Sequence, residues 1–125
     1  MMNKYEISVA ARSTFVPDQS DADEGRFVFA YTITITNTGE VAAQLISRSW
    51  NVNDANGHTE KVRGLGVVGQ QPLLQPGEAF EYTSGTRLRT PTGTMHGSYT
   101  MVTKGGQVFE ARIAPFTLAV PNALN

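Results

Sequence analysis

The chain contains no cysteine, which excludes disulfide bonds, thiolate catalysis and zinc sites built on cysteine. It has two histidines, His58 and His96, whose separation along the chain does not suggest a set of metal ligands. No apolar run approaches the roughly 18 residues that a membrane-spanning helix needs. Charge of one sign is not in excess either, since 10 basic residues stand against 11 acidic ones. This balance predicts no binding to nucleic acid or to an anionic membrane.

What is present is the composition of an ordinary soluble protein. A length of 125 residues, of which 40% are hydrophobic, predicts one domain, residues 1–125, that is large enough to bury a core of its own. The first fifteen residues, MMNKYEISVAARSTF, lack the apolar segment and small-residue cleavage site of a signal peptide. We therefore expect a cytoplasmic protein.

Alternation of apolar and polar residues with a period of two dominates the sequence. In RFVFAYTITITNT, residues 26–38, the odd positions from 27 to 35 are apolar and threonines line the other face, as in a half-buried antiparallel strand. Turn signals such as Asn56-Gly57 and Gly105-Gly106 separate similar short segments. The pattern predicts an all-β sandwich of immunoglobulin-like shape with seven or eight strands and no helix beyond a turn or two.

Three local features refine this prediction. The segment 44–53 alternates with its even positions inward, which places Ile46 and Trp50 in the core, although Arg48 interrupts that face. The last strand changes its alternation near Pro115, and a one-residue bulge there explains the change. Two loops look long, residues 17–25 and 64–77.

Gly64, Gly66 and Gly69 form a G-x-G-x-x-G motif, the pattern of a phosphate-binding loop that opens a helix. Two glutamines and a proline follow the motif here, and they give no amphipathic helix. One interpretation is that the loop amides still bind an anion, helped by Lys61 and Arg63. The interpretation that we favour is a structural turn whose glycines allow positive φ or close backbone packing. It predicts little or no nucleotide affinity.

Other candidate sites carry less information. The acidic loop with Asp21 and Asp23 lacks the residue spacing of a calcium loop, and Ser84 lacks the first glycine of a nucleophile elbow. We therefore predict no catalytic residues, no metal site, no cofactor and no enzymatic activity. Arg87 and Arg89 flank Leu88. They either line a solvated strand face or form a recognition surface together with the glycine loop.

The stretch GLGVVGQQPLLQPGEAFEYTSGTRLRTPTGTMHGSYTM, residues 64–101, with ITITNTGE and LISRSW before it, resembles the ApaG family. The resemblance covers nearly the whole chain. It implies a single fibronectin type III-like sandwich and a small cytoplasmic bacterial protein, with a genetic link to cobalt and magnesium efflux. Similar domains in larger eukaryotic proteins, including F-box proteins, look like binding modules. The family has no established catalytic residues, so none is transferred to this chain.

Two functions remain open from the sequence. The leading hypothesis is a non-enzymatic protein–protein interaction module, because sandwich domains present loops and strand edges that pair with a partner peptide or with a second copy in a homodimer. The alternative is a sensor or accessory protein that binds a polyphosphate nucleotide or a divalent cation through the loop Gly64–Gly69.

Overall fold

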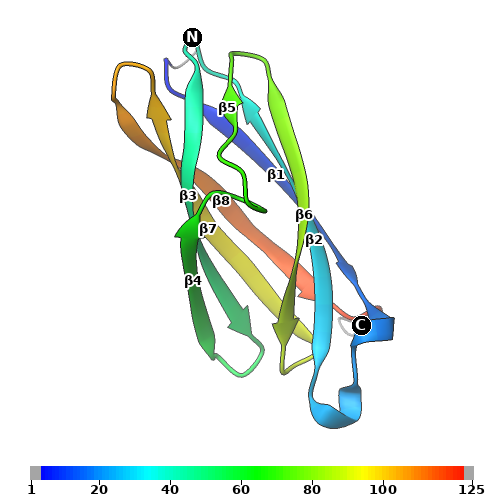
Figure 1. The fold of residues 1–125 in the computed structure, drawn as a ribbon. Coiled ribbons are helices and arrows are strands. Elements are labelled where there is room, and N and C mark those ends of the chain that lie inside the picture. The colour runs from blue at the N-terminus through cyan, green and yellow to red at the C-terminus, as the bar shows by residue number, and fades with distance from the viewer. Residues whose placement is uncertain (1–3, 123–125) are drawn as a thin grey trace.

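The computed structural model describes residues 4–122, which form two antiparallel sheets packed face to face (Figure 1). One sheet has the strand order β1-β2-β6, with β1 Ile7–Phe15, β2 Phe27–Asn37 and β6 Ala79–Leu88. The other has the order β4-β3-β7-β8, with β4 Thr59–Leu65, β3 Ala43–Asp54, β7 Thr92–Thr103 and β8 Val108–Ala119. The short β5, Leu73–Leu74, also pairs with β3. The predicted all-β sandwich is confirmed.

Helical structure is limited to the acidic loop between β1 and β2. Two 3-10 turns of three residues each, η1 Pro17–Gln19 and η2 Ala22–Glu24, are the only helical segments in residues 4–122. The side chain of Asp21 caps η2 by accepting a hydrogen bond from the backbone N–H of Asp23 at 3.1 Å. In the described part of the chain, no helix is long and apolar enough to cross a membrane.

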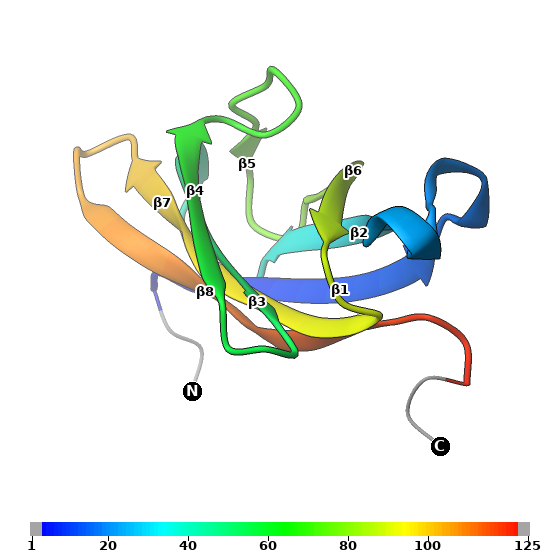
Figure 2. The same cartoon turned by 90° about the horizontal axis from the view of Figure 1, so that it is seen from below.

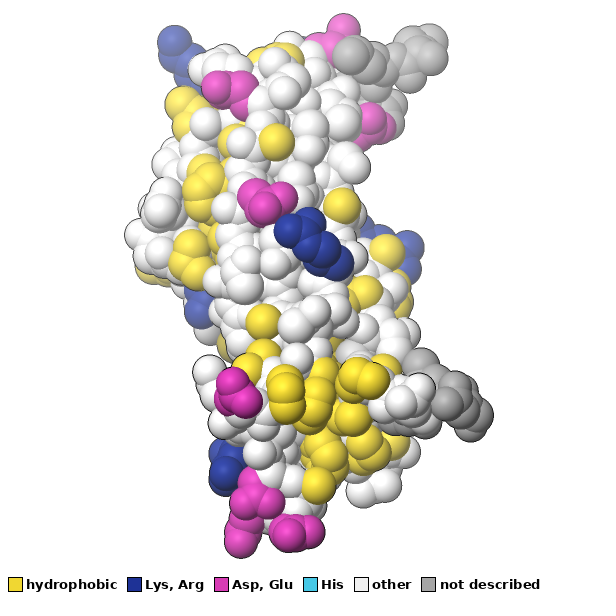
Figure 3. Space-filling view, turned by 90° about the vertical axis from the view of Figure 1, so that its right-hand side faces the viewer, with side chains coloured by type: hydrophobic (Ala, Val, Ile, Leu, Met, Phe, Trp, Pro, Cys, Tyr) yellow, Lys and Arg dark blue, Asp and Glu magenta, His cyan; other side chains and the backbone are white. Residues whose placement is uncertain are grey.

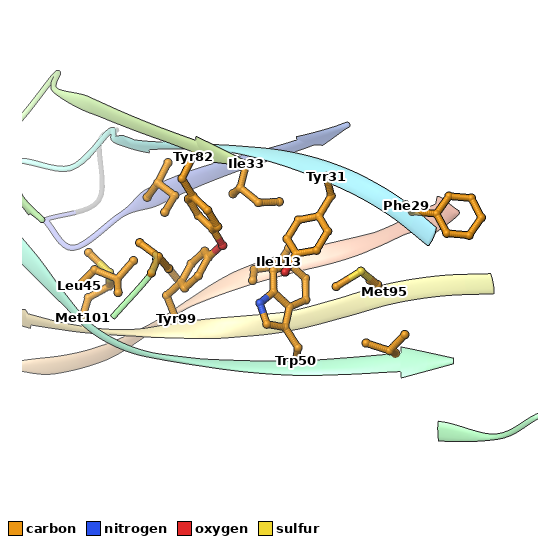
Figure 4. Close-up of a cluster of buried hydrophobic side chains, with 14 of the residues drawn as sticks. Phe29, Tyr31, Ile33, Leu45, Trp50, Tyr82, Met95, Tyr99, Met101 and Ile113 are labelled. Carbon is orange, nitrogen blue, oxygen red and sulfur yellow. The ribbon is translucent and has the colours of Figure 1, made fainter. Parts of the chain in front are cut away.

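The core lies between the sheets, and its centre is aromatic (Figure 4). Trp50 is 2% exposed, as the sequence predicted. Its ring lies 5.4 Å from that of Tyr31 and 6.0 Å from that of Phe116, both in edge-to-face contact. Such pairs stabilise a core beyond the area that they bury. The odd positions of β2 that the alternation placed inward are buried, apart from the half-buried Phe27 at its start.

Two bulges adjust the strand registers. The pairing of β7 with β8 shifts opposite the segment that contains Pro115, so the predicted bulge there is confirmed. The pairing of β3 with β7 shifts between Leu45 and Ser47. Ile46 is the extra residue, and Leu45 is fully buried in its place. The prediction that Ile46 occupies an inward position was therefore wrong, because a bulge moves the alternation by one residue.

Close contact between β3 and β7 depends on glycine. Gly97 lies opposite Trp50, and a Cβ atom at this position would lie 1.9 Å from the carbonyl oxygen of Ser49. At Gly93, a Cβ atom would lie 2.4 Å from the carbonyl oxygen of Asn53. The glycines of the sequence T-P-x-G-x-M-x-G-x-Y thus have a packing role.

A buried asparagine joins three segments at the end of β2. Asn37 is buried, and its side-chain amide donates to the carbonyl oxygens of Val41 at 2.8 Å and Leu74 at 2.9 Å. Its side-chain oxygen accepts a hydrogen bond from Gly39 N–H at 2.9 Å. These three bonds fix the turn after β2 and attach β5 to it, which explains the N-T-G of the sequence ITITNTGE.

The two lateral sides of the sandwich differ. Along one side β1 lies against β8, and Ser13 Oγ donates a hydrogen bond to the carbonyl oxygen of Thr117 at 2.7 Å. On the other side the edge strands β4 and β6 face each other without pairing (Figure 2). We call this the open side. The outer face of the three-stranded sheet carries the ion pair Arg12–Glu81, at 3.8 Å, and hydrophobic side chains gathered on its lower half (Figure 3).

Candidate functional site

The candidate site is the open side of the sandwich, which has three parts. The loop between β4 and β5 projects there beside β6 (Figures 1 and 2). A pocket of about 200 Å³ lies between the edge strands and is lined by residues of both, including Val62 of β4 and Ser84 of β6. Arginine side chains gather where β6 ends, around Arg87 and Arg89.

The loop is a fixed turn. Val67 and Gln70 exchange backbone hydrogen bonds of 2.8 and 2.9 Å. Between them Val68 has a φ of 44° and Gly69 a φ of 79°, as in a type I′ hairpin turn. Gly66, with a φ of 63°, donates its N–H to the carbonyl oxygen of Ile46 at 2.8 Å. The loop is therefore attached to the bulge in β3.

Three large hydrophobic side chains project from this region into solvent. Leu65 is 76% exposed, Val68 53% and Leu73 56%. We call these three residues the loop patch. Val68 adds a second anomaly, since a β-branched residue in the left-handed region is a conformational outlier that costs about 1–2 kcal/mol. Such strain is concentrated at functional sites. Sequence reasoning missed the loop patch. The two valines between Gly66 and Gly69 could have indicated it, because hydrophobic residues are unusual in a glycine turn.

The pocket combines apolar walls with a few polar groups. Tyr31, Val62 and Met95 contribute apolar surface, and Arg48 and Trp50 also line it. Arg48 Nη1 donates to the carbonyl oxygens of Leu65 at 3.0 Å and Gly66 at 2.9 Å. The arginine that interrupted the inward face of its strand thus connects the pocket to the loop.

One buried donor beside the pocket is unsatisfied. Within residues 4–122, Trp50 Nε1–H has no hydrogen-bond partner. Figure 4 shows the indole nitrogen directed toward the part of the core that holds Tyr82 and Tyr99. Buried polar groups are nearly always hydrogen-bonded, so an orphaned donor at a pocket wall calls for a specific reason.

The arginines occupy a separate part of the open side. Arg87 and Arg89 line a pocket of about 380 Å³ together with Arg26 and Glu24. They also line a smaller one of about 100 Å³ with Glu60 and other residues near the start of β4. Neither pocket contains a residue of the glycine loop. The structure groups these arginines with Arg26, which the sequence did not predict.

Comparison with known proteins identifies the family of this chain. The model of a family described as the ApaG domain matches residues 17–103. The chain belongs to the ApaG family. It is 62% identical to Protein ApaG of Acidovorax sp. (strain JS42) over 92% of this chain and 84% of that protein. It is 58% identical to Protein ApaG of Dechloromonas aromatica (strain RCB) over 98% of this chain and 97% of that one.

A solved structure agrees with the fold. The crystal structure of a protein described as ApaA from Bordetella pertussis superimposes with a TM-score of 0.94 at 52% sequence identity. The match covers 98% of this chain and 100% of that one. The described residues therefore have the ApaG fold over their whole length.

The three glycines of the G-x-G-x-x-G motif have two different structural roles. Gly66 and Gly69 have the predicted positive φ. Gly64 differs, because it lies within β4 and its missing side chain leaves room for the guanidinium of Arg48, 2.8 Å from where a Cβ atom would lie. Lys61 and Arg63 are exposed at alternate positions of the same strand.

The loop amides are mostly occupied. The N–H groups of Gly66, Val67 and Gln70 all donate to backbone carbonyl oxygens of the chain. The successive N–H groups of Val68 and Gly69 have no partner among the described residues, and an anion-binding nest needs such groups. The positive φ values and the backbone hydrogen bonds of the loop agree with a structural turn, whereas the absence of nucleotide affinity remains a prediction. In residues 4–122 no three His, Asp or Glu side chains are grouped in a way that could hold a metal ion.

Two glycine substitutions separate conformational strain from steric clash in this loop. Gly69→Ala places a side chain at positive φ in open space and should cost about 1 kcal/mol of the free energy of unfolding. Gly66→Ala adds a contact of 2.4 Å between its Cβ atom and the carbonyl oxygen of Gln70, so it should cost more. Urea denaturation of both variants measures the difference. Equal costs would contradict the packing role of Gly66.

Two buried tyrosines meet beneath the open side. The hydroxyl groups of Tyr82 and Tyr99 form a hydrogen bond between the sheets (Figure 4). Burial raises the pKa of Tyr82 from 10.0 to about 12, although its hydrogen bond with Tyr99 and the positive charge of Arg48 act to lower it. Burial and the neighbouring Tyr82 raise the pKa of Tyr99 still further.

This pair predicts alkaline sensitivity. A tyrosine whose pKa is raised by folding stabilises the fold fully below its unfolded pKa of 10.0, and this contribution is lost as pH rises toward the folded pKa. We expect the free energy of unfolding to fall between pH 10 and 12, with tyrosinate absorbance rising in step with unfolding. In the double variant Tyr82→Phe, Tyr99→Phe, the decline above pH 10 should be smaller. An unchanged decline would assign the alkaline sensitivity to other groups.

Proposed function

We propose that this chain is a cytoplasmic, non-enzymatic protein–protein interaction module of the fibronectin type III-like class, which binds its partner at the open side of the sandwich. The observation that carries the proposal is the loop patch. Leu65, Val68 and Leu73 are each more than half exposed. Val68 lies in a turn that hydrogen bonds hold in one conformation, Leu73 follows this turn on β5, and Leu65 precedes it on the outer face of the larger sheet.

The energetics of binding favour this surface. Hydrophobic side chains near the centre of an interface supply much of its binding energy. A loop that is already ordered loses little conformational entropy on binding. The backbone strain at Val68 is not offset by packing within this chain, because the Val68 side chain is exposed. Contact of this side chain with a partner would offset the strain.

Site-specific photo-crosslinking tests the proposal. Benzoylphenylalanine placed at residue 68 in cells should give a covalent adduct with a different protein. The same group at residue 14, an exposed position on β1 away from the open side, should not. Serine substitution of all three loop-patch residues should lower capture of that partner at least tenfold without lowering the melting temperature. Equal adducts from both positions, or none from residue 68, would refute the proposal.

A second candidate is a sensor or accessory protein for a polyphosphate nucleotide or a divalent cation. Two observations favour it: the N–H groups of Val68 and Gly69 make no hydrogen bond within the described residues, and Lys61 and Arg63 are exposed nearby. ATP, Mg²⁺ or Co²⁺ at 100 times its Kd would stabilise the fold by about 2.7 kcal/mol. Thermal melts with each ligand, followed through Trp50 fluorescence, therefore test it. An unchanged melting temperature would exclude it, and we then propose that any link to cobalt or magnesium efflux acts through a protein partner.

A further inference from the structure

We propose that the free edge of β6 pairs with an extended segment of the partner protein, and that an acidic side chain of this segment enters the pocket between β4 and β6. This inference rests on the proposed interaction function and specifies the form of the partner. It starts from a mismatch between the sheets: one has three strands, whereas the other has four strands and the short β5.

The mismatch leaves one strand position empty. Within residues 4–122, no further strand lies beside β6, so the inner face of β3 and β4 opposite that position is covered only in part. The pocket of about 200 Å³ lies at this position. A fourth strand beside β6 would extend the smaller sheet over the pocket and complete the sandwich.

The hydrogen-bond ladder shows which groups are free to pair. Asn37 N–H donates to the carbonyl oxygen of Glu78 at the start of the β2–β6 ladder. In an antiparallel ladder every second residue bonds to one neighbour and the intervening residues point to the other side. Tyr82 and Ser84 therefore bond to β2, whereas the N–H and C=O groups of Thr83 and Gly85 point to the open side.

The same alternation directs the partner's side chains. Ser84 and Thr86, which line the pocket, face the inside of the sandwich. In a paired strand, residues directly opposite each other place their side chains on the same face of the sheet. A partner residue opposite Ser84 thus projects into the pocket. A volume of about 200 Å³ accommodates a single side chain and is smaller than typical small-molecule sites.

The polar groups of the pocket select an acidic side chain. Arg48 is the only cationic residue lining it, and no carboxylate lines it. A carboxylate accepts hydrogen bonds from a guanidinium and compensates its charge, and such charge-assisted bonds are stronger than neutral ones. The unpaired Trp50 Nε1–H is buried and directed toward Tyr82 and Tyr99 (Figure 4), so it is not one of the pocket's donors.

The edge of β6 is also the less protected of the two edges at the open side. Charged side chains on an edge strand oppose pairing with another chain. β4 has Glu60, Lys61 and Arg63 within seven residues. The stretch Thr83–Thr86 at the centre of β6 is uncharged and contains no proline. A partner strand therefore meets less opposition at β6.

The probe for this proposal is the peptide acetyl-Thr-Thr-Val-Glu-Val-Thr-Thr-amide, titrated into the ¹⁵N-labelled chain and followed by NMR. We expect chemical-shift changes of the Thr83 and Gly85 amides and of the single indole N–H, that of Trp50. A matched peptide with lysine in place of glutamate should bind on the order of tenfold more weakly. Equal affinity of the two peptides would overturn the role of the acidic side chain.

Two substitutions at one residue test the backbone pairing. Gly85→Ala keeps the outward N–H, and its Cβ atom would meet only the carbonyl oxygen of Phe29 at an ordinary 3.6 Å, so binding should be retained. Gly85→Pro removes that N–H at an edge position where proline is tolerated, and binding should fall at least tenfold. The melting temperature of each variant is measured first, and binding is compared only if both variants are folded. Equal binding by the two variants would overturn strand pairing.

The remaining outcomes are also decisive. If the peptide leaves the β6 amides unchanged while residue 68 still crosslinks to a partner, the interaction function stands and strand pairing fails. If the shifts at Thr83 and Gly85 depend on protein concentration without peptide, the edge pairs with a second copy of this chain instead. If neither crosslinks nor shifts occur, both proposals fail.

Discussion

Replacing Trp50 with alanine is expected to lower the free energy of unfolding by about 3–5 kcal/mol, the usual cost of removing a large buried aromatic side chain. The indole ring is the centre of the aromatic core and lies in edge-to-face contact with Tyr31, Tyr99 and Phe116. These partners come from both sheets. Neither sheet can therefore shift to fill the cavity left by the indole ring without losing contacts elsewhere in the core. The cost is therefore expected near the upper end of this range.

Urea denaturation followed by far-ultraviolet circular dichroism measures this effect, since the variant has no tryptophan for fluorescence. Trp50→Phe is the matched control, because it retains an aromatic ring and removes the unpaired Nε1–H. It should lose less stability than the alanine variant. An alanine variant that melts within a few degrees of the parent would contradict the central position of Trp50 in the core.

Replacing Gly97 with alanine is expected to cost about 3 kcal/mol or more, at or above the upper end of the usual range for overpacking. The added Cβ atom would lie 1.9 Å from the carbonyl oxygen of Ser49 and 3.1 Å from the Cα of Trp50. Both are backbone atoms of β3, so no side-chain rotation relieves the contact. β3 and β7 must separate, and the core around Trp50 then loses contacts.

Gly85→Ala is the control for this prediction. Both glycines lie within strands, and the alanine at residue 85 has room for its Cβ atom, so its free energy of unfolding should stay within about 1 kcal/mol of the parent. If Gly97→Ala refolds from urea with the same stability as Gly85→Ala, the two strands are not as close as described.

The residues of the ApaG-like stretch 64–101 and of the sequence ITITNTGE divide into those with a structural explanation and those without one. Gly66 and Gly97 permit close backbone contacts, and Asn37 supplies three hydrogen bonds at a buried junction. By contrast, nothing in the fold requires the exposed side chains of Leu65 and Val68. This division is the reason for assigning partner binding to the loop patch rather than to the glycine motif as a whole.

The sequence by itself determined the fold class, the strands and several single positions. Period-two alternation is a local property of a strand with one buried face, so the burial of Trp50 and the bulge near Pro115 were readable without a structure. The failure at Ile46 is equally local, because a bulge changes the register without a distinctive residue type. The glycine pattern also predicted positive φ or close backbone packing, and Gly66 and Gly69 have positive φ.

Only the tertiary structure decided where the candidate site lies. Strand order brings Arg48 and Ser84 to one pocket although they are distant in sequence, and it places Arg87 beside Arg26. Among the described residues, it also leaves β6 without a neighbouring strand on one side. Pairing between strands depends on long-range contacts and on which edges remain uncovered, and alternation within one strand carries no information about either. The sequence therefore did not predict the open side, which depends on how the two sheets pack.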